Sequence, residues 1–260
     1  MADRVGAQKG NLMMLSGSFY IPKERSSRPQ GDDSHFICEE KQTIGLADGV
    51  GGWSSKGIDA GIYARELMNN ALMAAILTQS DRQVDPMTVL SEAYSKTKAL
   101  GSSTACIITL KDDNMLHAVN MGDSGFMLIR GGVVIYKSPI QQHNFNFPYQ
   151  LGYSSENTDK PSQAEVIKLG VEPGDVIIAG TDGLFDNLSE DQILEAAAEG
   201  IEQGLDPEDV AWPVAQRAYN VSMDGQAVTP FMQASILAGR RHTGGKRDDI
   251  TVIVSRILDM

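Results

Sequence analysis

Aspartates at the ends of short apolar segments are the feature that most restricts the fold of this chain. They occur in the sequences GDDSHF (Asp32 and Asp33), GLADGVGG (Asp48), NMGDSG (Asp123), IIAGTDG (Asp182) and RDDITVIV (Asp248 and Asp249). Neighbouring strands of one sheet bring their ends together, so a fold that pairs these segments would gather the carboxylates at one point. Any one aspartate alone is explained more simply as a turn or capping residue. The combination favours a shared site.

Short segments rich in β-branched residues alternate with turn signals along the chain, which is typical of strands. They are residues 16–21, 34–40, 42–48, 103–110, 115–121, 125–130, 133–138, 164–169, 175–180 and 249–255. The short separators KDDN, GDS and GG between residues 110 and 133 indicate antiparallel hairpins.

Helical signals are fewer and well marked. Apolar residues within 59–78 recur with a period close to 3.6. Four further helix starts are indicated by Asp85-Pro86, by the capping box Ser189 to Gln192, by Asp206-Pro207 and by Thr229-Pro230. Pro213 should bend or interrupt the helix that begins at Pro207. The order of elements predicts an α+β sandwich with helices covering the sheets, in a single domain of residues 1–260.

Charge and composition restrict the classes of partner that the chain can bind. The chain has 34 acidic and 22 basic residues, a net charge of −12 and a pI near 4.7. Such a surface disfavours nucleic acid and anionic membranes as partners, since both need positive charge. The longest apolar helical stretch, residues 71–77, is far too short to span a bilayer. Nothing in the sequence argues for an interface, so we expect a monomer.

The cysteines and the N-terminus bear on the compartment. Cys38 and Cys106 both lie in apolar strand-like runs and are expected to be reduced core residues of a cytosolic type of protein. The N-terminal residues lack the apolar core of a secretory signal. We therefore expect a cytoplasmic or nuclear protein; a plastid or mitochondrion is compatible if a transit peptide has been removed.

The clustered acids suggest metal chemistry. Several carboxylates within a few ångströms repel one another unless cations or protons neutralise them. Oxygen ligands without a Cys/His cluster select Mg²⁺ or Mn²⁺ over zinc. Two such ions about 4 Å apart are suited to activating water against phosphorus.

The motifs GDDSHF, LADGVGGW, GSSTA, MGDSG, AGTDGLFDNL and RDDITVIV stand in this order from about Arg28 to Val254. They resemble the motif set of the PP2C-type (PPM) metal-dependent serine/threonine protein phosphatases. DGVGGW followed by GIDAGIYARELM is similar to the compact plant and organelle-type branch. The resemblance implies a β-sandwich of two mainly antiparallel sheets flanked by α-helices. It also implies hydrolysis of phosphoserine and phosphothreonine in phosphoproteins by a hydroxide between two Mg²⁺ or Mn²⁺ ions, with a weaker third ion in some members.

The resemblance assigns the central metal ligands. Asp48 corresponds to the ligand that bridges both metals, and the carbonyl of Gly49 to a second contact. Asp182 and Asp248 correspond to ligands of the second metal. The glycines around Asp48 are expected to leave room for carbonyls and waters to reach the ions.

Further residues receive roles from the same motifs. Asp32 stands where the family usually has glutamate, and Asp33 is the neighbouring acid. Asp123 corresponds to a ligand of the weaker third ion, shared with Asp182. Arg28 falls where the family places its phosphate-binding arginine, whose planar fork suits a phosphate dianion. Asp249 is expected only to support its neighbour.

One departure concerns acid catalysis. Many family members have DGHGG, whose histidine is a proposed general acid, and here that position is Val50. The loss of a proton donor would cost on the order of 10²-fold on poor leaving groups, unless a metal-bound water or His242 replaces it. The other histidines, His35, His117 and His143, are expected to be structural or solvated.

Other functions stay open at this point. A catalytically weak or inactive PP2C-like module that binds a phosphoprotein partner is the main alternative, and a hydrolase of small phosphoesters is another. A structural Ca²⁺ module lacks the EF-hand loop pattern. A cysteine phosphatase is excluded, because neither cysteine is followed by the arginine of a CxxxxxR loop. The segments 137–160 and 220–246 are candidates for substrate contact.

Overall fold

The computed structural model describes residues 11–23, 29–79, 83–153 and 158–260, in which two five-stranded sheets are stacked face to face. The first sheet has the order β1 (Leu12–Ile21), β14 (Ile250–Asp259), β13 (Val176–Gly180), β7 (Gly125–Arg130) and β8 (Val133–Lys137). The second has the order β12 (Glu165–Gly170), β6 (Met115–Met121), β5 (Ala105–Leu110), β3 (Thr43–Asp48) and β2 (Asp33–Cys38). Adjacent strands are antiparallel in both sheets.

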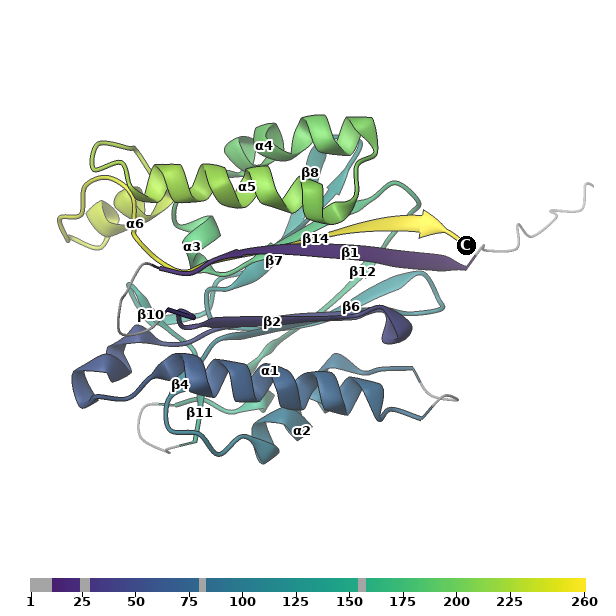
Figure 1. Ribbon diagram of the computed structural model, residues 1–260, viewed down its shortest axis with the longest axis horizontal. Helices are drawn as coiled ribbons and strands as arrows, with labels where there is room; N and C mark the ends of the chain where they lie inside the picture. The colour runs from purple at the N-terminus through teal and green to yellow at the C-terminus, as the bar shows by residue number, and fades with distance from the viewer. Residues whose placement is uncertain (1–10, 24–28, 80–82, 154–157) are drawn as a thin grey trace, which may run out of the picture.

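Helices form the two outer layers (Figure 1). Helices α1 (Ala60–Ile76) and α2 (Pro86–Lys96) cover the second sheet. Helices α4 (Glu190–Gln203) and α5 (Pro207–Ser222) lie over the first sheet, and the short α3 (Asp182–Phe185) and α6 (Pro230–Leu237) lie near one end of it. The predicted sandwich of two antiparallel sheets flanked by helices is confirmed.

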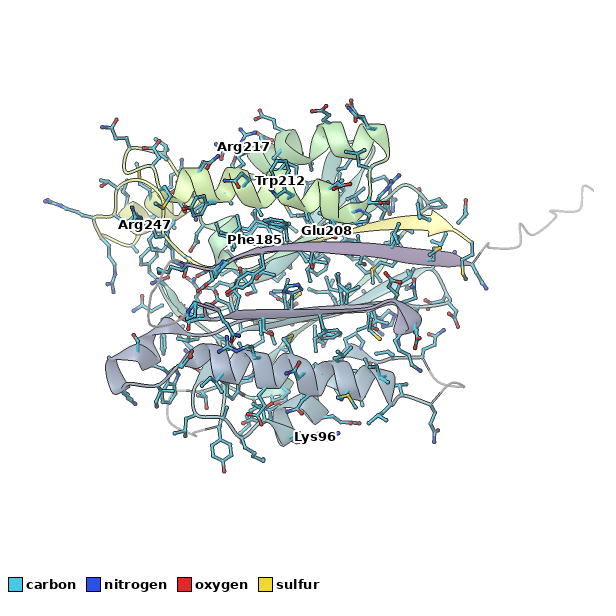
Figure 2. The ribbon with its side chains drawn as sticks, viewed as in Figure 1. Lys96, Phe185, Glu208, Trp212, Arg217 and Arg247 are labelled. Carbon is cyan, nitrogen blue, oxygen red and sulfur yellow. The ribbon has the colours of Figure 1, made fainter. Side chains whose placement is uncertain are left out.

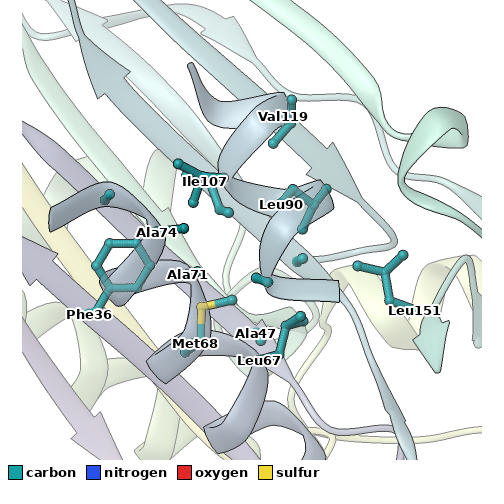
Figure 3. Packing of buried hydrophobic residues seen from close by; sticks show 14 of the residues in the cluster. Phe36, Ala47, Leu67, Met68, Ala71, Ala74, Leu90, Ile107, Val119 and Leu151 are labelled. Carbon is teal, nitrogen blue, oxygen red and sulfur yellow. The ribbon is translucent and has the colours of Figure 1, made fainter. Parts of the chain in front are cut away.

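Alternation along the central strands builds three hydrophobic clusters. Cys106 and Ile108 of β5 point into the cluster between the sheets, whereas Ala105 and Ile107 point toward α1 and α2. Strands β7, β13 and β14 alternate in the same way between that middle cluster and the one beneath α4 and α5. Figure 3 shows Ile107 facing the residues of the α1 and α2 layer, such as Leu90. Because side chains of a strand alternate with period two, strands apolar on both faces must lie between two covered layers.

Local capping explains where the helices begin. The side chain of Asp59 accepts a hydrogen bond from Gly61 N, and that of Asp85 accepts one from Thr88 N. Ser189 forms the predicted capping box with Gln192. Each cap satisfies a backbone N–H that has no partner inside its helix.

Two expectations about elements need correction. Helix α5 continues through Pro213 from Pro207 to Ser222, so the predicted interruption is wrong. Packing of its apolar face against β1 and β14 outweighs the one hydrogen bond that proline removes. Strand β1 begins at Leu12, earlier than the expected residue 16, because it pairs with β14 along its whole length.

Both cysteines are free and buried, as expected, Cys38 beneath α1 and Cys106 between the sheets. No helix in the described part of the chain is both long enough and apolar enough to cross a bilayer.

The contact between α5 and β1 depends on a glycine. A Cβ at Gly17 would lie 2.3 Å from the backbone nitrogen of Glu208, whose position at the start of α5 is marked in Figure 2. We expect Gly17→Ala to lower the free energy of unfolding by about 1–3 kcal/mol, because backbone must move to admit the methyl group. Gly170→Ala is the matched control, since its Cβ would meet only Met115 Sδ at 3.9 Å. Equal urea midpoints for the two variants would contradict this.

Candidate functional site

Strand register brings the acidic strand ends to one end of the sandwich. Asp33, the first residue of β2, pairs directly with Asp48, the last residue of β3. In the other sheet, Gly180 at the end of β13 pairs with Val252 of β14 and with Gly125 of β7. Asp123, Asp182 and Asp248, which lie within a few residues of these paired positions, are therefore held at one end of the first sheet. Asp33 and Asp48 lie at an end of the second sheet.

A cleft of about 410 Å³ opens at this end. Six of the residues proposed as metal ligands line it: Asp32, Asp48, Gly49, Asp123, Asp182 and Asp248. Asp33 is buried close by and is not part of the lining. Arg28 lies outside the described residues.

Asp33 joins the two sheets. Its Oδ2 accepts hydrogen bonds from Thr181 Oγ1 at 2.8 Å and from Thr251 Oγ1 at 2.7 Å. Thr181 directly follows β13 and Thr251 lies in β14, and both strands belong to the first sheet. Its other oxygen, Oδ1, is buried with no hydrogen-bond partner among the described residues. Burial, followed by repulsion from Asp249, raises the pKa of Asp33 well above its ordinary value. The two hydroxyls therefore fix a carboxylate that still has a coordination position open.

Asp249 anchors the segment that carries Asp32. Its carboxylate accepts hydrogen bonds from Tyr20 Oη at 3.0 Å, from the backbone N–H of Lys23 at 2.8 Å and from that of Asp32 at 3.1 Å. Asp249, the neighbour of Asp248, thus holds the backbone at Asp32 in place. This geometry fits the supporting role expected for Asp249.

Electrostatic repulsion within the cleft is strong. Removal from water, followed by repulsion from Asp182, raises the pKa of Asp48 well above its ordinary value. The same two causes raise the pKa of Asp248. They also raise that of Asp123 to about 7, although a hydrogen bond from Gln142 Nε2 at 2.9 Å opposes the shift. Carboxyl groups in this state bind either protons or cations.

The glycines beside Asp48 have two different functions. A Cβ at Gly49 would lie 2.6 Å from the carbonyl oxygen of Asp32, so glycine permits close backbone packing there. A Cβ at Gly51 or Gly52 would meet nothing within 4 Å, and both residues line the cleft. Only these later glycines fit the expectation that the loop leaves open space.

Lys246 and Asp186 are site residues that the sequence analysis missed. The Lys246 ammonium lies 2.6 Å from Asp186 Oδ2 and 3.3 Å from Asp248 Oδ2, and it also contacts Asp182 Oδ2. Burial lowers the pKa of Lys246, but attraction to Asp182, Asp186 and Asp248 outweighs burial and raises it well above its ordinary value. The spacing of Asp182 and Asp186, four residues apart, was a signal for a shared face on a helical turn.

The donor set fits a hard divalent ion. Asp33 Oδ1 and Asp182 Oδ1 are buried without a hydrogen-bond partner in the described part of the chain. The acidic residues around them offer oxygen ligands only, which suits Mg²⁺ or Mn²⁺. No three His, Cys, Asp or Glu side chains among the described residues form a ready-made metal cage. The carboxylates would therefore close on an ion as it replaces protons.

Both candidate substrate segments reach the cleft. Asn146 and Pro148 line it from residues 137–160, and Phe231 and His242 from residues 220–246. Val50 also lines it. His242 is thus the histidine placed at the cleft, with its ring edge-on to Phe231 at 4.8 Å between centroids.

Comparison with known proteins identifies the family. A family profile described as "Stage II sporulation protein E (SpoIIE)" matches residues 39–258. The chain is 47% identical to "Probable protein phosphatase 2C 80" of Arabidopsis thaliana, covering 95% of this chain and 59% of that protein. It is 36% identical to "Protein phosphatase PTC7 homolog fig" of Drosophila ananassae, covering 91% of this chain and 76% of that protein. The chain belongs to the SpoIIE/PP2C family. The resemblance inferred from the motifs is confirmed.

Solved structures place this PP2C-family chain in the same fold. The "photosystem II phosphatase PBCP" superposes with a TM-score of 0.85 at 29% identity, covering 94% of this chain and 98% of that one. The catalytic domain of "serine threonine protein phosphatase PstP" in complex with two manganese ions has a TM-score of 0.66 at 15% identity, covering 95% and 100%. RsbX in complex with magnesium has a TM-score of 0.57 at 17% identity, covering 94% and 96%. At these lower identities the likeness shows the fold alone.

The raised pKa values predict a pH-dependent stability of the metal-free protein. Folding raises the pKa of Asp123 from 3.8 to about 7. The carboxyl group of Asp123 therefore binds its proton more tightly in the folded state than in the unfolded state. Protonation of Asp123 stabilises the fold fully below pH 3.8, and this stabilisation is lost as the pH rises through about 7. Over this interval, we expect melting temperatures in EDTA to fall less steeply for Asp123→Asn than for the unmodified chain.

Added Mn²⁺ should change this dependence. The ion competes with protons for the same oxygens, so the rise in melting temperature that Mn²⁺ causes should be larger at about pH 8 than at about pH 5. Thermal melts across this range check both statements. An Mn²⁺ effect of equal size at both pH values would show that the carboxylates do not exchange protons for the ion.

Proposed function

We propose that this chain hydrolyses phosphoserine and phosphothreonine in proteins, using two Mg²⁺ or Mn²⁺ ions. The observation that carries the proposal is the convergence of five acidic strand ends on one cleft, with two buried carboxylate oxygens left without partners in the described residues. Membership of the PP2C family and the names of its relatives support it. The chain spans 59% and 52% of the length of two Arabidopsis relatives, so the activity of a longer protein is part of the proposal.

The chain's own carboxylates would hold the ions. Asp48, Asp182 and Asp248, with the carbonyl of Gly49, are the proposed ligands, and Asp32 and Asp33 complete the set. When bound, the ions would supply an activated water for attack on phosphorus and positive charge for the phosphoryl oxygens. The hydroxyls of Thr181 and Thr251 keep Asp33 in place before any ion binds.

Basic side chains at the cleft would attract the phosphate. Lys23 and Arg247 line it, and Figure 2 places Arg247 at the end of the sandwich beside α6. These groups counter the net charge of −12 locally, which a phosphate dianion needs in order to approach. Arg28 is proposed to bind phosphate as well.

The test is hydrolysis of a phosphothreonine peptide with Mn²⁺, Mg²⁺ or EDTA. Activity should require one of the ions, and Asp48→Asn should reduce it by more than about 100-fold, since even outer-shell partners of a metal contribute 10–100-fold. Asp191→Asn is the matched control, because Asp191 is exposed on α4, outside the cleft lining. Malachite green detection of released phosphate gives the rate. A hydrolase of small phosphoesters would act on p-nitrophenyl phosphate but not on the peptide.

Absence of turnover with either ion, in protein whose melting curve shows that it is folded, would contradict this function. That outcome would support the alternative of a PP2C-like module that binds a phosphoprotein without hydrolysing it.

Val50 predicts a dependence on the leaving group. A threonine alkoxide needs a proton, whereas p-nitrophenolate leaves without one, and Val50 supplies none. We expect Val50→His to raise the rate on a phosphothreonine peptide by up to about 10²-fold and to leave the rate on p-nitrophenyl phosphate nearly unchanged. Val50→Ile is the control for added volume. Equal acceleration of both substrates would show that protonation of the leaving group is not what Val50 limits.

A further inference from the structure

A lysine ammonium lies inside the carboxylate cluster. The Lys246 side chain is 13% exposed, and its Nζ contacts carboxylates of Asp182 and Asp186, with Asp248 Oδ2 at 3.3 Å. The ring of Phe231 covers it, with 4.9 Å from Nζ to the ring centroid. A charged group this enclosed is stable only where opposite charges surround it.

The backbone of Lys246 is fixed. The side chain of Asn187 accepts a hydrogen bond from Lys246 N at 2.9 Å and donates one to Lys246 O at 2.8 Å. The preceding Gly245 packs so closely that a Cβ there would lie 2.1 Å from Val221 O. The lysine therefore enters the cluster from a rigid segment rather than from a mobile loop.

The ammonium takes oxygens that a divalent ion would need. It contacts Oδ2 of Asp182 and Oδ2 of Asp186, while Asp182 Oδ1 has no hydrogen-bond partner among the described residues. A divalent ion placed between Asp182 and Asp186 would lie close to a fixed positive charge in a partly buried site, and the two would repel strongly. An ion bound through Asp182 Oδ1 would leave the contacts of Lys246 with Asp182 Oδ2 and Asp186 Oδ2 in place.

We propose that Lys246 is a built-in cation that fills the place beside Asp182 and Asp186, so that this chain binds two divalent ions and excludes a third. The inference rests on the proposed metal-dependent function and changes one expectation drawn from the family resemblance, the weaker third ion at Asp123 and Asp182. In this chain the positive charge beside Asp182, the ligand that the third ion would share, is supplied by Lys246 and does not depend on the ion concentration.

The test counts ions rather than turnover. Equilibrium dialysis against Mn²⁺, followed by elemental analysis of the protein, should give two ions for the unmodified chain and three for Lys246→Met. Lys23→Met is the matched control: Lys23 also lines the cleft and pairs with Asp248 at 3.5 Å, but within the described residues it forms no ion pair with Asp182 or Asp186. That variant should still bind two. Adding Asp186→Asn to Lys246→Met should return the count to two, because the extra ion loses a ligand.

Three bound ions in the unmodified chain, or two in a folded Lys246→Met, would overturn the inference. Should Lys246→Met fail to fold, crystals of the unmodified chain grown with Mn²⁺ decide the question. An anomalous scattering peak beside Asp186 Oδ2 overturns the inference, whereas two peaks, neither of them beside Asp186 Oδ2, support it. The proposed function and this inference can be told apart by their failures. If the chain binds no Mn²⁺, both are overturned. If it binds three ions and hydrolyses the peptide, only this inference is overturned.

Discussion

Repulsion among buried carboxylates is the constraint on which the rest of this structure depends. Asp48, Asp123, Asp182 and Asp248 line one cleft, and repulsion from Asp182 contributes to the raised pKa of each of the other three. Such a cluster would destabilise the fold unless protons, cations or an internal lysine compensate. Lys246 supplies part of that compensation, and the remaining oxygens are left to protons or divalent ions.

The same end of the sandwich is where the two sheets are cross-linked. Asp33 at the start of β2 accepts hydrogen bonds from Thr181 and Thr251, which lie at strands β13 and β14 of the other sheet. Asp249 accepts a hydrogen bond from the backbone of Asp32. The polar groups that position the acids are therefore also the groups that align the sheets. The apolar clusters beneath the helices provide the bulk of the burial, and the carboxylates fix the relative placement at the cleft.

Much of the fold could be predicted because it depends on short-range patterns. Segments rich in β-branched residues between turn signals marked the strands, and caps such as Ser189 marked the helix starts. Pro213 was misjudged because a local rule ignores the packing of α5 on β1 and β14. The acids of the site were found from their places at strand ends. Asp186 was missed because the helical turn that sets it beside Asp182 is only four residues long.

The sequence by itself determined which chemistry is available: oxygen ligands at strand ends, basic residues near them, and valine in place of the histidine of the DGHGG motif. These are properties of residue type and local spacing. Only the tertiary structure decided which charges meet. Lys246 is 64 positions from Asp182 and 60 from Asp186, and their contact exists because the start of β14 returns beside the end of β13. Distant pairing of this kind is set by strand register and packing, which no local pattern encodes.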